Sequence, residues 1–214
     1  MIGDTILITQ RHIEKAEYIV REIYDKISLH EKFILAIGGE SGTGKTEIST
    51  VLQQKFYKLK IRSIIVHIDD YYRIDPELRD KRRKETGIIG KDEVDWDSFN
   101  DLIKAFISDQ FHLRVKEIHK YINSFAHIVY PNTNIDILII DGLYANFVEN
   151  KTVGIYLEGS IKETEQFRRA RGKENPDDPF RRIVLEKERN CVVQSRRLAD
   201  IIIPYNFKLD EGKF

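Results

Sequence analysis

Short apolar runs alternate with amphipathic stretches along most of the chain. The clearest run is residues 33–37, FILAI, which is bounded by glycines and typical of a buried strand. Similar runs predict strands over residues 61–68, 134–141, 151–157 and 199–204. Helical patterns lie between them, over residues 47–57, 163–171 and 180–198. Strands that alternate with helices predict a mainly parallel sheet covered on both faces, a three-layer α/β/α fold.

An amphipathic helix is predicted over residues 10–27, with Thr9 as its N-cap. Charged residues separate its apolar positions, which we expect to share one face: Ile13, Ala16, Val20, Ile23 and Ile27. We interpret residues 1–30 as an N-terminal helical extension that packs on a single domain spanning residues 1–214.

Two other segments depart from the alternation. Residues 74–93 are highly charged and interrupted by Gly87 and Gly90, which fits either a solvated loop or a flap on the substrate side. After them, Asp97 or Ser98 is expected to cap a helix that continues to residue 107. Residues 111–130 alternate weakly and predict a strand hairpin.

Composition narrows the class of protein. Lysine plus arginine equals aspartate plus glutamate at 35 each, so no global charge indicates nucleic acid or an acidic membrane as a partner. Cys191 is the single cysteine, which suits a reducing compartment. Neither a secretory signal nor a long apolar segment is visible, so we expect a cytoplasmic protein without a membrane anchor. The sequence leaves open whether it forms a homo-oligomer.

A phosphate-binding motif follows the first strand. Residues 39–46 fit the pattern G-x4-G-K-[ST], in which backbone N–H groups cradle phosphate oxygens: Gly39, Glu40, Ser41, Gly42, Thr43, Gly44, Lys45 and Thr46. In this motif the lysine contacts the β- and γ-phosphates and the hydroxyl of Thr46 can bind Mg²⁺. A helix that begins near Lys45 would place its positive end at the same phosphates. The motif predicts a nucleoside triphosphate site.

Acidic residues end two later strands. Asp69 and Asp70 follow residues 61–68, at an edge where ligands bind in open α/β sheets. Because strand side chains alternate, only one of this pair is expected to point into the cleft. Asp141 ends the strand over 134–141, where an acid of phosphate-loop enzymes holds the Mg²⁺ shell, directly or through water.

The order of these motifs resembles the uridine kinase and phosphoribulokinase family of phosphate-loop kinases. The similarity covers about residues 33–204 and rests on GESGTGKTEIS (39–49), IDDYYR (68–73), ILIIDGLYA (137–145), FRRARG (167–172) and ADIIIP (199–204). It implies a phosphate-loop fold with a helical lid over residues 163–185, a flap over 74–93 and a substrate-side hairpin.

The resemblance also implies roles for individual residues. Asp69 matches the general base toward the acceptor hydroxyl, and Arg168 and Arg171 match lid arginines that, at a spacing of three, share a helix face. Positions expected to contact the substrate are Tyr72, Arg73 and Asp97. Two features depart from the family: Asp141-Gly142 stands where Glu-Gly is usual, and residues 94–99, VDWDSF, lack the His-Pro pair typical of uridine kinases.

The sequence therefore predicts an ATP-dependent, Mg²⁺-using kinase that phosphorylates a hydroxyl of a small metabolite. A nucleoside leads as the acceptor, and a phosphorylated sugar, a pantothenate-like or a glycerate-like compound remain alternatives. A non-catalytic nucleotide-binding regulator is the rival from another class, although it would not need an acid at position 69 or paired lid arginines. The guanine-specific Asn-Lys-x-Asp motif is absent from the sequence.

Overall fold

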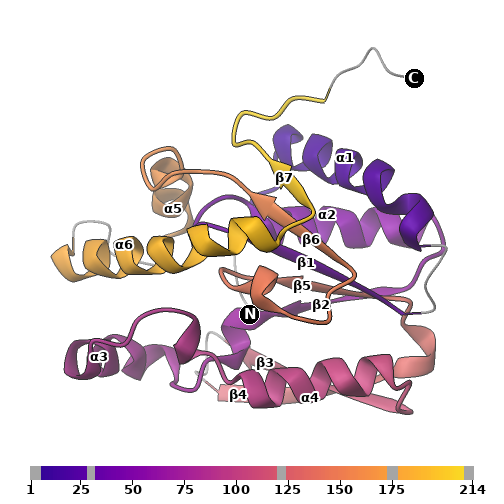
Figure 1. Cartoon of the computed structure of the whole chain (residues 1–214), viewed down its shortest axis with the longest axis horizontal. Coiled ribbons are helices and arrows are strands. Elements are labelled where there is room, and N and C mark those ends of the chain that lie inside the picture. The colour runs from indigo at the N-terminus through magenta and orange to yellow at the C-terminus, as the bar shows by residue number, and fades with distance from the viewer. Residues whose placement is uncertain (1–5, 28–31, 120–123, 173–177, 210–214) are drawn as a thin grey trace.

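The centre of the molecule is a parallel sheet of five strands in the order β2-β5-β1-β6-β7. The computed structural model describes residues 6–27, 32–119, 124–172 and 178–209. The strands are β1 (Phe33–Gly39), β2 (Ser63–His67), β5 (Ile137–Asp141), β6 (Val153–Leu157) and β7 (Ile201–Ile203). Figure 1 shows the strands of this sheet with helices packed around them, which confirms the predicted α/β fold class.

Each face of the sheet has its own core, because alternate side chains of β1 point to opposite sides. Leu35 and Ile37 pack under α1 (Gln10–Ile27) and α2 (Lys45–Lys58), while Ile34 and Ala36 face the other layer. That other layer contains α4 (Trp96–Ile107), α6 (Pro179–Gln194) and the antiparallel pair β3 (His112–His119) and β4 (Ser124–Pro131). The predicted hairpin is therefore confirmed.

The buried face of α1 differs in part from the predicted one. Ile19 is fully buried between Ala16 and Ile23, whereas Ile13 is exposed and Val20 is half-buried. The face that packs on α2 also carries two polar residues, His12 and Lys15, which are buried against the rest of the protein. The positions of apolar residues alone could not predict this buried face, because polar side chains also lie on it.

The charged stretch over residues 74–93 is mostly helical rather than a loop. The helix α3 covers Pro76–Thr86, with proline in its first turn and Gly87 at a φ of 68° at its end. The prediction overlooked this arrangement of proline at the start and glycine at the stop. The next helix, α4, is capped by Asp95, whose side chain accepts from the Ser98 N–H, and not by Asp97 or Ser98.

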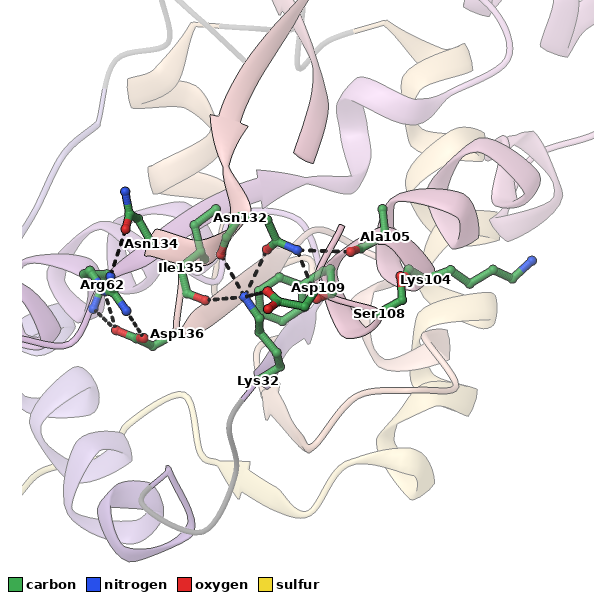
Figure 2. Close-up of polar contacts among 11 residues, drawn as sticks. Lys32, Arg62, Lys104, Ala105, Ser108, Asp109, Asn132, Asn134, Ile135 and Asp136 are labelled. Carbon is green, nitrogen blue, oxygen red and sulfur yellow. Dashed lines mark hydrogen bonds and ion pairs between the residues drawn. The ribbon is translucent and has the colours of Figure 1, made fainter. Parts of the chain in front are cut away.

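Polar side chains join the elements at the amino edge of the sheet (Figure 2). The Lys32 ammonium donates to the carbonyl oxygens of Asn132 at 2.8 Å and Ile135 at 3.0 Å, and it lies 3.0 Å from Asp109 Oδ1. These bonds hold the start of β1 to the end of α4 and to the segment before β5. The phosphate loop follows the carboxyl end of β1, so these contacts hold the strand at the end opposite to the loop.

No helix within the described ranges combines the length and the apolar character needed to cross a membrane.

Candidate active site

The turn between β1 and α2 forms the phosphate loop. Gly44 has a φ of 88° directly before α2 begins at Lys45. Gly39 has a φ of 144°, and a Cβ there would lie 2.4 Å from the Leu157 carbonyl oxygen. Both positions therefore require glycine. The loop closes against the positive end of α2, which is the geometry of an anion-binding turn.

The side chains of the loop point inward and hold it closed. Lys45 Nζ donates to the carbonyl oxygens of Gly39 at 2.9 Å and Glu40 at 2.8 Å, and Thr43 Oγ1 donates to the same Glu40 oxygen at 2.9 Å. Thr46 lies half-buried in the first turn of α2. The predicted cation and hydroxyl therefore stand together where the helix starts.

A histidine absent from the sequence prediction orients Asp141. In the sheet Asp141 is aligned with Ile37 of β1 and with His67 of β2, so it lies beside the strand that carries the phosphate loop. His67 Nδ1 lies 2.6 Å from Asp141 Oδ1. Burial alone would raise the pKa of Asp141, but the charge and hydrogen bond of His67 and the charge of Lys45 lower it. His67 and Lys45 thus favour the ionised form of Asp141, although only 2 % of it is exposed.

Asp69 and Asp70 do not leave a strand on opposite sides as predicted. The strand β2 ends at His67, and both acids lie in a 3-10 turn over Ile68–Tyr71. Asp69 is half-buried, and its Oδ1 is 3.6 Å from where a Cβ on Gly142 would lie, directly beside Asp141. Asp70, in contrast, is fully buried. The two acids are separated by the turn rather than by strand alternation.

One of these acids, Asp141, fits a magnesium ion that completes its shell with phosphate and water. Asp141 Oδ2 and Asp69 Oδ1 are buried oxygens with no hydrogen-bond partner in the described part of the chain. Mg²⁺ is commonly held by one or two carboxylates together with substrate phosphates. No cluster of three or more histidine, cysteine or acidic residues suited to a metal is found among the described residues, so a cage built from protein alone does not fit them.

Arg168, one of the two predicted lid arginines, lies next to the phosphate loop. Arg168 is in α5 (Glu165–Arg171), and its Cγ would be 3.0 Å from a Cβ on Gly42. Its guanidinium donates to Thr164 Oγ1 and, at 2.9 Å, to the Ile161 carbonyl oxygen. Arg171 ends the same helix, but its side chain lies outside the described residues. Glu40 and Ser41 line a small cavity together with Arg168, Glu188 and Arg189.

The predicted substrate positions separate into two groups. Tyr72 is 4 % exposed, and the guanidinium of Arg79 lies 3.8 Å above its ring centre. Arg73 and Asp97 instead contact each other at 3.9 Å on the surface, where Asp97 is almost fully exposed. Tyr72 is therefore buried close to Asp69, whereas Arg73 and Asp97 lie on the exposed surface.

His12 of α1 is a second residue that sequence reasoning missed. Its Nε2 lies 2.6 Å from the position that a Cβ on Gly44 would take. The Thr9 N–H donates to its Nδ1 at 3.1 Å, so in the neutral ring the proton is on Nε2. The N-terminal extension thereby supports the phosphate loop. The available signal was the spacing of His12, four residues before Ala16, which places it on the same helix face.

Comparison with known proteins agrees with this geometry. The model of the "Phosphoribulokinase / Uridine kinase family" matches residues 34–162. A bifunctional alpha-galactosidase/sucrose kinase of Mediterraneibacter gnavus is 25% identical over 201 residues, which is 85% of this chain but only 22% of that protein. The chain thus spans about a fifth of the length of the curated relative it matches.

Two solved structures share the fold. One is a protein assigned as a fructose transport system kinase in Silicibacter sp. TM1040, with a TM-score of 0.65 and 16% identity over 88% of this chain and 98% of that one. The other is phosphoribulokinase from Rhodobacter spheroides, with a TM-score of 0.63 and 12% identity over 81% of this chain and 70% of that one.

Proposed function

The chain belongs to the phosphoribulokinase / uridine kinase family, and on that premise we propose that it is an ATP-dependent kinase that phosphorylates a hydroxyl group of a carbohydrate. One observation carries the proposal: Asp69 and Asp141 lie together beside the phosphate loop, each with a buried oxygen that no described residue binds. One acid is available to an acceptor hydroxyl and the other to a metal. A nucleotide-binding regulator has no use for the first.

In the proposed reaction the acceptor hydroxyl gives its proton to the Asp69 carboxylate. The acceptor oxygen then bonds to the γ-phosphorus as the bond to the β,γ-bridging oxygen breaks, and ADP leaves. Lys45 stands at the phosphate loop and Arg168 over it, where their positive charges stabilise the charge that spreads over the transferring group.

Thr46 and Asp141 would hold Mg²⁺, which when bound neutralises charge on the phosphate oxygens. His67 fixes the orientation of the Asp141 carboxylate through the bond to Oδ1 and leaves Oδ2 available. Such an outer partner normally tunes both the affinity and the orientation of a metal ligand. In this proposal Asp141 is therefore oriented before nucleotide binds.

The likeness to the bifunctional relative supports a carbohydrate acceptor. Only one of the two activities in that protein's name, sucrose kinase, transfers a phosphoryl group, and only that activity calls for a phosphate loop. We therefore take the kinase activity as the counterpart of this chain.

Arg79 supports the same class of acceptor. Its Nε and Nη2 atoms are buried, and neither has a hydrogen-bond partner in the described part of the chain. Because the guanidinium lies on the ring of Tyr72, three residues after Asp69, these donors are near the catalytic acid. Two parallel N–H groups suit a pair of oxygens such as those of a phosphate or carboxylate, which a phosphorylated sugar or a sugar acid would supply.

The nucleoside predicted from sequence resemblance becomes the second candidate. Nucleobases commonly stack on accessible aromatic faces, whereas the tyrosine rings near Asp69 are buried in the core. Tyr71, Tyr72 and Tyr144 are each 4 % exposed or less, and Arg79 covers the face of Tyr72.

The direct test measures ADP release from Mg²⁺-ATP with each member of a panel: sucrose, fructose, ribulose 5-phosphate, glycerate, pantothenate and uridine. The proposal expects turnover that depends on a carbohydrate and disappears in Asp69→Asn. Turnover with uridine alone would reverse the order of the two candidates. ATP binding without turnover for any acceptor would favour the regulator.

A further inference from the structure

Arg83 lies at the centre of a buried ionic cluster formed by segments far apart in the chain. It is in α3, and its side chain is 4% exposed. Its Nε and Nη2 donate to the two carboxylate oxygens of Glu93 at 2.7 and 2.9 Å. The same Nη2 donates to Glu188 Oε1 of α6 at 3.0 Å. The fork of one arginine thus joins α3, the turn over Lys91–Glu93 and α6. Figure 1 shows α3 and α6 on the same side of the molecule.

Glu93 connects this cluster to the acceptor side of the site. Its backbone carbonyl accepts the Arg73 N–H at 2.9 Å, and the following residue, Val94, bridges to Tyr72. The Gly90 N–H also donates to Glu93 Oε2 at 3.0 Å. Whatever holds Glu93 therefore holds the segment that directly follows Asp69.

The other carboxylate, Glu188, connects the cluster to the phosphate loop. Its neighbour Arg189 donates from Nε to Glu40 Oε1 at 3.2 Å, and Glu40 is in the loop itself. One turn of α6 thus contacts the donor loop through Arg189 and α3 through Glu188. A second contact also joins α6 to α3: Lys187 Nζ donates to the Gly87 carbonyl at the end of α3.

A buried ion pair of this kind fixes geometry more than it adds stability. Taking charges out of water costs about as much as their attraction returns, and apolar residues of equal volume often serve stability as well. The directional hydrogen bonds of the Arg83 guanidinium set a defined spacing among three backbone segments, which apolar packing does not do.

We propose that Arg83 is a positioning residue that couples the donor loop to the acceptor segment, through Glu188 on one side and Glu93 on the other. Nucleotide at the phosphate loop then acts on Glu40 and Arg189, shifts or stiffens α6, and secures α3 over the acceptor. The inference rests on the proposed kinase function only in explaining why such coupling would be useful. The coupling itself links nucleotide binding to the position of α3 and does not require phosphoryl transfer.

The test is hydrogen exchange of the amides in residues 76–86, with and without Mg²⁺ and adenylyl imidodiphosphate. In the wild-type protein we expect the nucleotide analogue to slow this exchange by about 10-fold, within the usual range of coupling between sites. Glu188→Gln keeps the shape but removes the charge that binds Arg83, and Arg83→Lys keeps the charge but removes the fork. Both are expected to reduce the slowing to about 2-fold or less.

Arg82→Ala is the matched control. Arg82 is next to Arg83 on the same helix, but its side chain is 59% exposed and its ion pair with Glu85 is 3.9 Å long. This variant should keep the full nucleotide-dependent slowing. Thermal melts identify any variant that fails to fold, and calorimetry confirms that each variant still binds the analogue. A role in stability alone would lower the melting temperature and leave the nucleotide-dependent ratio unchanged.

The inference is overturned if Glu188→Gln and Arg83→Lys fold, bind the analogue and still show the wild-type slowing, or if the wild-type protein shows none. These outcomes are independent of the proposed acceptor. A protein that phosphorylates a sugar without protecting α3 refutes the coupling alone. One that protects α3 on nucleotide binding but phosphorylates nothing refutes the kinase function alone.

Discussion

Changing the neighbouring acids Asp69 and Asp70 to asparagine, one at a time, should have different effects: the first change should lower kcat and the second should raise stability. Asp69→Asn keeps the shape of the side chain and removes its ability to accept a proton. A positioned general base contributes roughly 10²–10⁴-fold to the rate, so kcat should fall by that factor. Binding of adenylyl imidodiphosphate should survive, because Asp69 belongs to the acceptor side.

Asp70→Asn should affect stability instead. Burial, to which the charge of Asp69 adds, raises the pKa of Asp70 to about 6 from an ordinary value of 3.8, although His67 opposes the shift. Because the pKa of Asp70 is higher in the folded state, its protonated carboxyl contributes to the free energy of unfolding. That contribution is fully present below pH 3.8 and is lost as the pH rises through about 6. A shift of roughly two units corresponds to about 3 kcal/mol.

Asparagine cannot ionise, so Asp70→Asn should increase the free energy of unfolding by up to about 3 kcal/mol at pH 8 and by about half as much at pH 5. Urea denaturation at the two pH values measures this, and kcat for the same variant should stay within several-fold of wild type. An inactive Asp70→Asn beside an active Asp69→Asn would show that the base is misassigned. Full activity in both would remove the hydroxyl-acceptor mechanism.

Three further changes test the rest of the site. Lys45→Ala should cost about 2–4 kcal/mol of transition-state stabilisation in kcat/KM with little change in melting temperature, and wild-type turnover would remove the phosphate-loop assignment. Arg79→Lys loses the fork of donors on Tyr72 and should raise the KM for the acceptor about 10–100-fold at constant KM for ATP; an unchanged acceptor KM would exclude Arg79 from recognition. His67→Asn frees Asp141 to rotate and should raise the Mg²⁺ concentration for half-maximal rate about 10–100-fold, whereas an unchanged Mg²⁺ titration would argue against Asp141 as a metal ligand.

Features set by local sequence were predictable. The buried strand before the phosphate loop needs only a run of apolar residues, and the loop needs glycine at fixed positions because its backbone conformation excludes other residues. The hairpin over residues 111–130 could be found from alternation alone. Each of these depends on neighbours within a few positions, which a sequence displays directly.

Features set by contacts across the chain were not predictable in the same way. The helix α3 is mostly charged, so its pattern resembles a solvated loop, yet Arg83 enters the interior to meet Glu93 and Glu188. His67 gains its role from strand pairing that aligns it with Asp141, 74 residues later. The side-chain alternation assumed for Asp69 failed because β2 ends earlier and the chain turns as a 3-10 helix.

The contact between His12 and Gly44 limits how this protein can be divided or recombined. The family match spans residues 34–162, yet the ring that covers Gly44 comes from α1, outside that span. The matched segment is therefore not an interchangeable module. A chimera that joins it to another protein's flanks must bring a side chain to the same place, because position 44, with a φ of 88°, cannot accept a larger residue to fill the gap itself.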